Sequence, residues 1–177
     1  MSITFDPLNE TYFPLLMLWL ESPHVKKWWD QDVTYTLELV REKFGKRIYN
    51  TPISNNLNKK TYAYIICMGK KEIGYIQVYN ARDFAEENGC NLGTLAGSVC
   101  GIDLFIGDQD FLGKGIGARI LNEFEKQIIV PHFDCCLIDP CRDNKRAIKA
   151  FEKAGFKEFL YVEKSNALWM LKPVEII

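Results

Sequence analysis

Three closely spaced glycines give this sequence its first candidate for ligand chemistry. Gly113, Gly115 and Gly117 follow an apolar run that begins at Val99, and an amphipathic pattern continues after them. Glycines let backbone N–H groups approach a ligand closely, and the start of a helix adds a partial positive charge, so this turn suits an anion such as pyrophosphate. LGKGIG fits neither the Walker loop nor the dinucleotide motif, and a plain tight turn before a helix is the alternative interpretation.

A carboxylate inside the same apolar run is the second candidate. Asp103 is costly in an apolar strand unless it is paired, hydrated or used. Because strand side chains alternate, Ile102 and Leu104 face one side of the sheet and Asp103 faces the other, where we expect a substrate cleft. A buried structural hydrogen bond is the alternative. Asp139 ends a second apolar strand, at the position where ligand clefts gather in α/β folds.

Aromatic and acidic side chains outside these strands are further candidates. We expect SPHVKKWWD to be a polar loop, in which Trp28 and Trp29 either plug the end of the core or form an aromatic wall beside a ligand. The irregular insertion 80–98 carries Glu86 and Glu87, which either recognise a cationic substrate or belong to a solvated acidic loop.

The elements that must position these residues follow from hydrophobic periodicity. Helical spacing predicts helices over 10–21, 34–44 and 116–128, and Asn144 and Gly155 bracket a further helix as its N-cap and its C-terminal glycine. Apolar or alternating runs predict a hairpin between 61–68 and 73–79 and strands over 3–5, 99–106, 135–138, 156–161 and 167–171. We expect these strands to form a mixed sheet in a single domain spanning residues 1–177.

Composition excludes several classes of protein. The 177 residues carry a net charge of −1 and no basic run, which argues against a nucleic-acid-binding protein. The apolar runs are too short to cross a bilayer, so we expect a cytoplasmic protein without a membrane partner. The six cysteines lack CxxC spacing and read as buried free thiols, so no metal site is predicted.

Two motifs in this order resemble those of the GNAT acetyltransferases. LGKGIG is similar to the family's coenzyme A pyrophosphate loop, although Leu112 stands where Arg or Gln is usual. DPCRDNKRAIKAFEKAGF resembles the family's Asn-x-x-Ala-x-x-x-Tyr segment, with Asn144 and Ala147 matching and Phe151 in place of Tyr. LLMLWLESPHVKKWW resembles one branch, the aminoglycoside 6'-N-acetyltransferases and related hydroxamate-siderophore acetyltransferases.

The resemblance implies an α/β (α+β) fold in which helices flank a mixed, mostly antiparallel sheet of about seven strands. The sheet is splayed between its central strands, and acetyl-CoA lies in the splay. It implies these cofactor-binding residues: Phe105, Ile106, Gly107, Leu112, Gly113, Lys114, Gly115, Ile116, Gly117, Asn144, Ala147 and Phe151. The acceptor site it implies contains Trp29, Tyr79, Glu86, Glu87, Asp103 and Asp139.

The implied chemistry is direct attack of a primary amine on the thioester, with Asp103 as the candidate for receiving the ammonium proton. The family's usual thiolate-protonating acid is a Tyr at the position of Phe151, which has no proton to give. Either the thiolate leaves without a protein acid or Tyr79 takes that role.

Three functions remain in competition. The first is acetylation of a polycationic small molecule at the 6'-amine of an aminoglycoside, which the acidic loop and the GID segment support. The second is acetylation of a hydroxylamine or amine in siderophore or polyamine-like metabolism. The third is a non-catalytic acyl-CoA-binding module, made conceivable by Phe151. Nothing in the sequence decides between a monomer and a homodimer.

Overall fold

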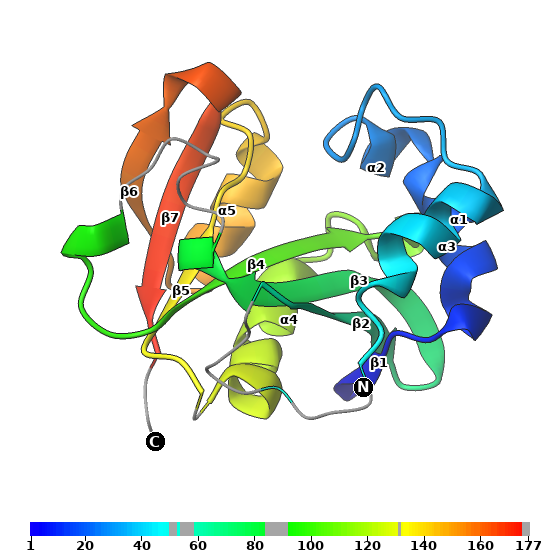
Figure 1. Ribbon diagram of the computed structural model, residues 1–177, viewed down its shortest axis with the longest axis horizontal. Coiled ribbons are helices and arrows are strands. Elements are labelled where there is room, and N and C mark those ends of the chain that lie inside the picture. The colour runs from blue at the N-terminus through cyan, green and yellow to red at the C-terminus, as the bar shows by residue number, and fades with distance from the viewer. Residues whose placement is uncertain (50–52, 54–58, 84–91, 131, 175–177) are drawn as a thin grey trace.

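A seven-stranded mixed sheet forms the centre of the computed structural model, which describes residues 1–49, 53, 59–83, 92–130 and 132–174 (Figure 1). The strand order is β1-β2-β3-β4-β5-β7-β6, and every neighbouring pair is antiparallel except β4 and β5. The predicted mixed, mostly antiparallel sheet is confirmed. The strands are β1 (Ile3–Pro7), β2 (Thr61–Met68), β3 (Lys71–Asn80), β4 (Val99–Ile106), β5 (Cys135–Ile138), β6 (Lys157–Val162) and β7 (Ala167–Pro173).

Five α-helices accompany the sheet in the described part of the chain: α1 (Phe13–Leu20), α2 (Pro23–Lys26), α3 (Leu37–Gly45), α4 (Ile116–Phe124) and α5 (Lys145–Lys153). The helix expected over 10–21 begins as a 3-10 turn, Glu10–Tyr12, and becomes α-helical only at Phe13. The helix expected from residue 34 begins at Leu37, because the Thr36 side chain caps it by accepting from the Leu39 N–H at 3.2 Å.

The segment SPHVKKWWD was expected to be a loop and instead contains α2. Pro23 stands at the first turn of this helix, where its fixed φ is favourable and its missing N–H costs nothing. The helix expected over 116–128 is α-helical as far as Phe124 and continues as a π-helical turn over Glu125–Ile129.

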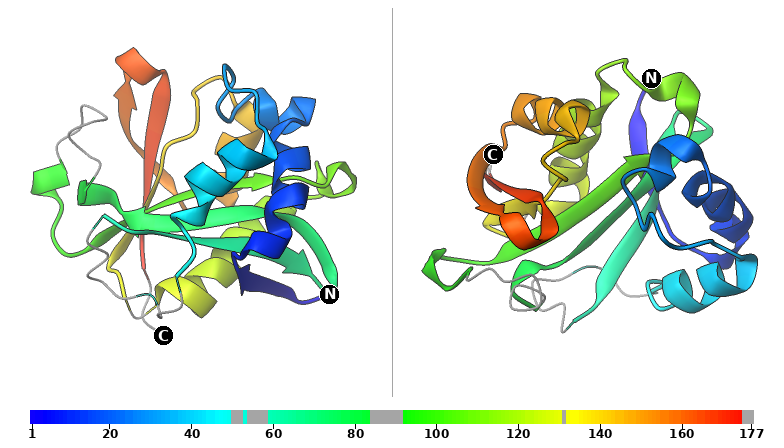
Figure 2. Two further views of the ribbon diagram at one scale, coloured as in Figure 1. Left: turned by 45° about the vertical axis from the view of Figure 1, so that its right-hand side comes forward. Right: turned by 90° about the horizontal axis from the view of Figure 1, so that it is seen from above.

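The two faces of the sheet are covered by different helices (Figures 1 and 2). On one face Ala63, Ile65 and Tyr75 pack in one buried cluster with side chains of α1 and α3. On the other face Ile66 and Ile76 pack with α4 and α5. Full burial of one such aliphatic side chain stabilises the fold by about 1.5–3 kcal/mol, so the sheet is anchored on both faces.

The sheet opens between β4 and β5. The two strands pair over three residues only, and Gly101↔Leu137 is the last pair, whereas β3 accompanies β4 as far as Ile106. From Asp103 onward the β4 side chains change from buried to partly buried. The predicted splay between the central strands is therefore confirmed, and Figure 1 shows β5 and β7 diverging from β3 and β4.

The cysteines of the described residues, Cys67, Cys100, Cys135, Cys136 and Cys141, are free thiols, as predicted, and three of them are buried. Cys90 lies outside the described residues. In the same part of the chain no helix is long and apolar enough to span a membrane. No cluster of three metal-ligating side chains occurs among these residues either.

Candidate active site

The open edge of β4 exposes backbone groups near three residues that the family resemblance implies as cofactor-binding, Phe105, Ile106 and Gly107. The Gly107 N–H donates to the Ile73 carbonyl at 2.9 Å, so the β4 backbone at Gly107 points toward β3. Because backbone direction alternates along a strand, Phe105 also points toward β3, and Ile106 points to the open edge. The Ile106 carbonyl contacts His24 Nε2 at 3.0 Å. Of the three predicted positions, Ile106 is the one whose N–H faces the splay.

The predicted anion-binding turn connects β4 to α4, and its glycines have separate roles. Gly113 and Gly115 adopt left-handed backbone conformations, with φ of +75° and +72°, and a Cβ at either would meet no atom within 4 Å. Gly115 is the N-cap of α4, so the turn presents an open backbone at a helix N-terminus. Gly117 allows close packing instead, because its Cβ would lie 3.3 Å from Ala150 on α5.

The other predicted cofactor residues lie on α4 and α5 or just before these helices. Lys114 is exposed in the turn, Leu112 is partly buried before it, and the Ile116 side chain belongs to the core. Asn144 caps α5 by accepting from the Ala147 N–H at 3.2 Å, as its capping pattern predicts. Phe151 is buried in the same core cluster as Ile116. Both helices thus begin just after the strands that diverge.

Asp103 lies in a hydrogen-bonded cluster on the face covered by α1 and α3, opposite Ile102, as predicted. Its Oδ2 accepts from Gln77 Nε2 at 2.6 Å, and its Oδ1 accepts from Tyr79 Oη at 3.3 Å. Burial raises the pKa of Asp103 above that of an ordinary Asp, while the two hydrogen bonds and the Arg47 charge oppose this rise. The carboxylate is therefore held in a fixed orientation at the edge of the splay.

Asp139 follows β5 and faces the same cluster across the splay. Burial, and then the charge of Asp103, raise the pKa of Asp139 to about 7. The pKa of Tyr79 is raised well above that of an ordinary phenol by burial and by both carboxylates, so its hydroxyl stays protonated at neutral pH. The structure thus brings Tyr79, Asp103 and Asp139 together, and the repulsion between the two carboxylates makes the site attractive to cations.

Trp29 is partly buried and packs against the core cluster that contains side chains of α1 and α3. Its ring packs edge-on against Tyr75 and Phe105, with centroids 5.9 Å and 5.1 Å away. Trp28 is 37% exposed and stands outside this packing. Of the two tryptophans, only Trp29 therefore joins the aromatic cluster at the site.

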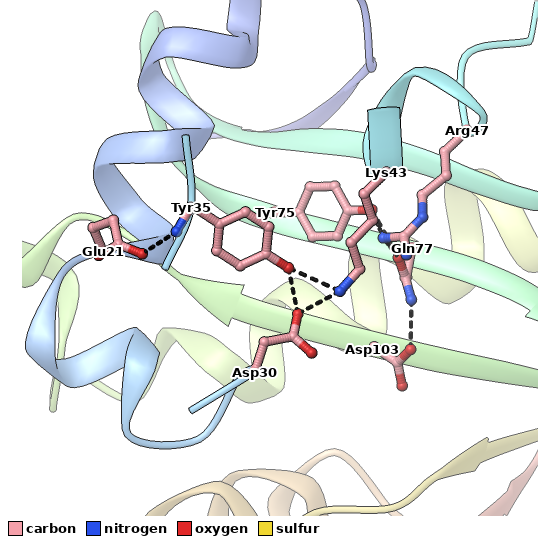
Figure 3. Close-up of polar contacts among 8 residues, drawn as sticks. All are labelled: Glu21, Asp30, Tyr35, Lys43, Arg47, Tyr75, Gln77 and Asp103. Carbon is pink, nitrogen blue, oxygen red and sulfur yellow. Dashed lines mark hydrogen bonds and ion pairs between the residues drawn. The ribbon is translucent and has the colours of Figure 1, made fainter. Parts of the chain in front are cut away.

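Polar contacts of the Asp30 side chain hold the segment that carries Trp29 in place (Figure 3). Asp30 has a left-handed backbone, with φ of +47°, which is uncommon for a residue other than glycine. Its carboxylate accepts from Tyr35 Oη at 2.5 Å and from Lys43 Nζ at 2.6 Å. These contacts fix the backbone immediately after Trp29.

Sequence reasoning missed two members of the cluster, Gln77 and Arg47. Gln77 is 6% exposed and lies directly opposite Asp103 in the β3–β4 register. A polar side chain in the apolar run IGYIQVY is the same signal that identified Asp103, so Gln77 was detectable. Arg47 follows α3 in a polar segment that carries no such signal. Glu86 and Glu87 lie outside the described residues.

The comparisons with known proteins agree with this fold. A family model described as "Acetyltransferase (GNAT) domain" matches residues 9–163. An aminoglycoside N(6')-acetyltransferase type 1 from Klebsiella pneumoniae is 27% identical over 158 residues, which cover 88% of this chain and 74% of that protein. A relative of the same description from Serratia marcescens matches equally well.

Solved structures of AAC(6')-Ib share the fold over almost the whole chain. The complex with paromomycin and acetyl-CoA has a TM-score of 0.74 and 26% identity, covering 98% of this chain and 94% of that one. The complex with ribostamycin and coenzyme A has a TM-score of 0.75, with the same identity and coverage. The family model spans both helix starts and the splayed strands, and the chain therefore belongs to the GNAT acetyltransferase family.

Proposed function

We propose that this protein transfers the acetyl group of acetyl-CoA to a primary amine of a polycationic small molecule, the 6'-amine of an aminoglycoside. The observation that carries the proposal is the Asp103 carboxylate, held by Gln77 and Tyr79 at the edge of the open β4–β5 splay. The structures of AAC(6')-Ib with aminoglycosides and acetyl-CoA or coenzyme A support the choice of both substrates.

Acetyl-CoA fits the open edge of β4. The pyrophosphate lies on the exposed backbone of the 113–117 turn, and the pantetheine arm follows β4 toward Ile106. The Ile106 N–H, which faces the splay, donates to the thioester carbonyl and to the oxyanion that develops on it. Asn144 and Ala147 line the arm from the start of α5.

The acceptor binds as a cation and reacts as a neutral amine. Asp103 takes one proton from the ammonium, directly or through water. The amine nitrogen then attacks the thioester carbonyl, and the C–N bond forms. The C–S bond breaks as the tetrahedral intermediate collapses, and the second proton of the attacking nitrogen passes to water. Because an ammonium has a much higher pKa than even a raised carboxyl, much of the contribution of Asp103 is positioning of the amine. Asp139 holds a neighbouring cationic group.

Coenzyme A leaves as the thiolate. Phe151 has no acidic proton and is buried in the core. The pKa of Tyr79 is raised well above that of an ordinary phenol, so its hydroxyl stays protonated. Transfer of this proton to a thiolate, whose conjugate thiol has a pKa of about 8.5, is therefore unfavourable. Tyr79 therefore serves as a hydrogen-bond donor to Asp103 and as a wall of the acceptor site.

The remaining assignments of the acceptor site follow from charge and shape. Trp29 supplies an aromatic wall, and Glu86 and Glu87 supply further carboxylates for a polycation. We propose a cytoplasmic location, as monomer or homodimer; light scattering measures the oligomeric state.

The testing experiment measures thiol release from acetyl-CoA with kanamycin-like and tobramycin-like aminoglycosides, a hydroxylated lysine and simple polyamines. Aminoglycoside-dependent release, with a product heavier by one acetyl group at the 6'-amine, is the expected result. Acetylation of the hydroxylamine alone would move the function to siderophore metabolism. Acetyl-CoA binding in calorimetry without release on any acceptor would identify a non-catalytic acyl-CoA-binding module.

Replacing Gly115 with Val is expected to weaken acetyl-CoA binding by about tenfold or more. A β-branched side chain is strained at φ of +72° and intrudes on the space assigned to the pyrophosphate. Titration calorimetry measures the change. Gly45→Ala is the control, because Gly45 has ordinary backbone geometry and its Cβ would meet nothing within 4 Å. Unchanged acetyl-CoA affinity in Gly115→Val would refute the assignment of this turn.

Replacing Gly101 with Ala is expected to lower turnover about tenfold, because the new Cβ would lie 2.3 Å from Tyr79 Cε2. The tyrosine ring must then leave its position over Gly101, and its hydroxyl loses Asp103. Steady-state kinetics of Gly101→Ala and of Tyr79→Phe, which removes the hydroxyl without a clash, should show similar losses. A normal rate in both variants would exclude Tyr79 from the site.

A further inference from the structure

The Asp103 cluster continues beyond Gln77 to a cation, the guanidinium of Arg47. Arg47 follows α3, and its backbone N–H donates to the Phe44 carbonyl at 2.9 Å. Its guanidinium lies 4.5 Å from the centre of the Phe44 ring. Among the described residues Arg47 forms no ion pair with a carboxylate. Its charge is directed at a neutral amide instead.

That amide is the side chain of Gln77 (Figure 3). Gln77 Oε1 accepts from Arg47 Nη1 at 2.6 Å and from Tyr75 Oη at 2.7 Å. Arg47 Nη1 also lies 3.0 Å from Tyr75 Oη. Both acceptor positions of the amide oxygen are thus occupied, and the amide nitrogen is left to donate to Asp103 Oδ2 at 2.6 Å.

The orientation of this amide is therefore determined by Arg47 on one side and by Asp103 on the other. If the amide turned over, its NH₂ group would face the guanidinium, which can only donate, and its oxygen would face the Asp103 carboxylate. In this flipped orientation both contacts are mismatched, and each buried polar group that loses its partner costs about 1–3 kcal/mol. With Arg47 in place, Gln77 presents a donor polarised by a neighbouring positive charge.

We propose that Arg47 is a positioning residue for acetyl transfer, which acts through Gln77 to hold the Asp103 carboxylate in place and in its ionised form. The inference rests on the proposed function, in which Asp103 receives the ammonium proton. Among the described residues, the guanidinium of Arg47 hydrogen-bonds to Gln77 and Tyr75, so the Gln77 amide links it to Asp103, and its charge also favours the ionised carboxylate.

The charges around Asp103 come from every element packed against it. Arg47, next to α3, favours the carboxylate form, and Asp30, in the segment after α2, opposes it. The charge of Asp103 in turn raises the pKa of Asp139, which lies beyond β5. It also raises the pKa of the Tyr75 and Tyr79 hydroxyls on β3. Loss of the Arg47 charge therefore raises the pKa of Asp103 further, and less carboxylate is ionised at neutral pH.

The test compares Arg47→Met, which keeps the apolar stem against Phe44, with Arg41→Met, which removes an exposed charge from α3, the helix that precedes Arg47. We expect Arg47→Met to lower kcat by about 10- to 100-fold, with the KM for acetyl-CoA unchanged. The acid limb of the pH–rate profile should move to higher pH, and Arg47→Lys should restore part of the rate. Arg41→Met should match the wild type in all three measurements.

A double-mutant cycle tests the route through the amide. In a Gln77→Leu background, Arg47→Met should have little further effect on kcat, because the relay is already absent. An equal effect in both backgrounds would show that the charge acts directly, and the proposal would fall. It would also fall if Arg47→Met lowered the melting temperature and the rate without moving the pH profile, since that pattern marks a structural role.

A measurement without substrate separates this proposal from the proposed function. Carbon-13 NMR of aspartate-labelled protein follows the titration of Asp103, which is identified as the resonance missing in Asp103→Asn. The titration should move to higher pH in Arg47→Met and stay in place in Arg41→Met. If it moves while the wild type acetylates no acceptor, the proposed function fails and the positioning of Asp103 by Arg47 stands. An unmoved titration overturns the positioning role.

Discussion

Replacing Asp103 with Asn is expected to lower turnover of the aminoglycoside acceptor by about 100- to 10,000-fold, the range typical of a lost acid–base group. The amide of Asn can still accept from Gln77 Nε2, so the geometry of the cluster is largely retained. It can neither take a proton nor provide a negative charge for the ammonium. Acetyl-CoA binds along β4 and the glycine turn, so its affinity in calorimetry should not change.

The pH dependence makes this prediction more specific. Since burial raises the pKa of Asp103, the wild-type rate should fall with acidification at a higher pH than an ordinary Asp would produce. Asp103→Asn should lose this limb of the kcat/KM profile. Asp32→Asn, at an exposed position, is the matched control. If Asp103→Asn turns over within twofold of the wild type, Asp103 has no part in the reaction.

Replacing Asp139 with Asn is expected to stabilise the protein at pH 8 by about 2 kcal/mol. Burial and the Asp103 charge raise the pKa of Asp139 to about 7, from near 4 in the unfolded chain. The full shift implies about twice that free energy, and partial exposure of the carboxyl reduces it. Denaturant unfolding at several pH values measures the difference between variant and wild type.

The sign of this effect follows from proton linkage. A raised folded-state pKa means that the folded wild type binds the Asp139 proton more tightly than the unfolded chain does. Its contribution to stability is complete below about pH 4 and is lost as the pH rises through about 7. The advantage of Asp139→Asn should therefore be absent near pH 4 and complete near pH 8.

Asp134 is a control for Asp139, because its pKa is shifted in the opposite direction. Hydrogen bonds from the Ser98 backbone N–H and hydroxyl lower the pKa of Asp134, so this carboxylate stabilises the fold above pH 4. Asp134→Asn should be destabilising at neutral pH, where Asp139→Asn is stabilising. A destabilised Asp139→Asn at pH 8 would contradict the raised pKa. If Asp139 binds a cationic group, the same variant should also raise the KM for the acceptor.

Local patterns in the sequence predicted most of the fold. Alternating and apolar runs located the strands, because a half-buried or fully buried strand needs them. Asn144 was identified as an N-cap and Gly155 as a C-terminal glycine, and the structure confirms the cap hydrogen bond to Ala147 and a φ of +97° at Gly155. Errors came at helix starts, as with the 3-10 turn before Phe13 and the short α2 at Pro23, where a single proline or cap decides the geometry.

Asp103 was predicted as a site residue from the sequence because a lone carboxylate in an apolar strand is a local signal. The family resemblance also named Tyr79 as a site residue, whereas Gln77 and Arg47 were not predicted. Gln77 lies opposite Asp103 only through the β3–β4 register, and Arg47 arrives only because α3 packs on that face of the sheet. Tyr79 reaches Asp103 across Gly101, where a side chain on the neighbouring strand would block it.

The sequence by itself therefore determined the elements, the family and the chemical groups of this protein, since propensity, capping and burial patterns act over a few residues. The tertiary structure decided which of those groups meet. Strand register and helix docking depend on packing between segments far apart in the chain, and these contacts orient Gln77 and bring the Arg47 charge to bear on Asp103.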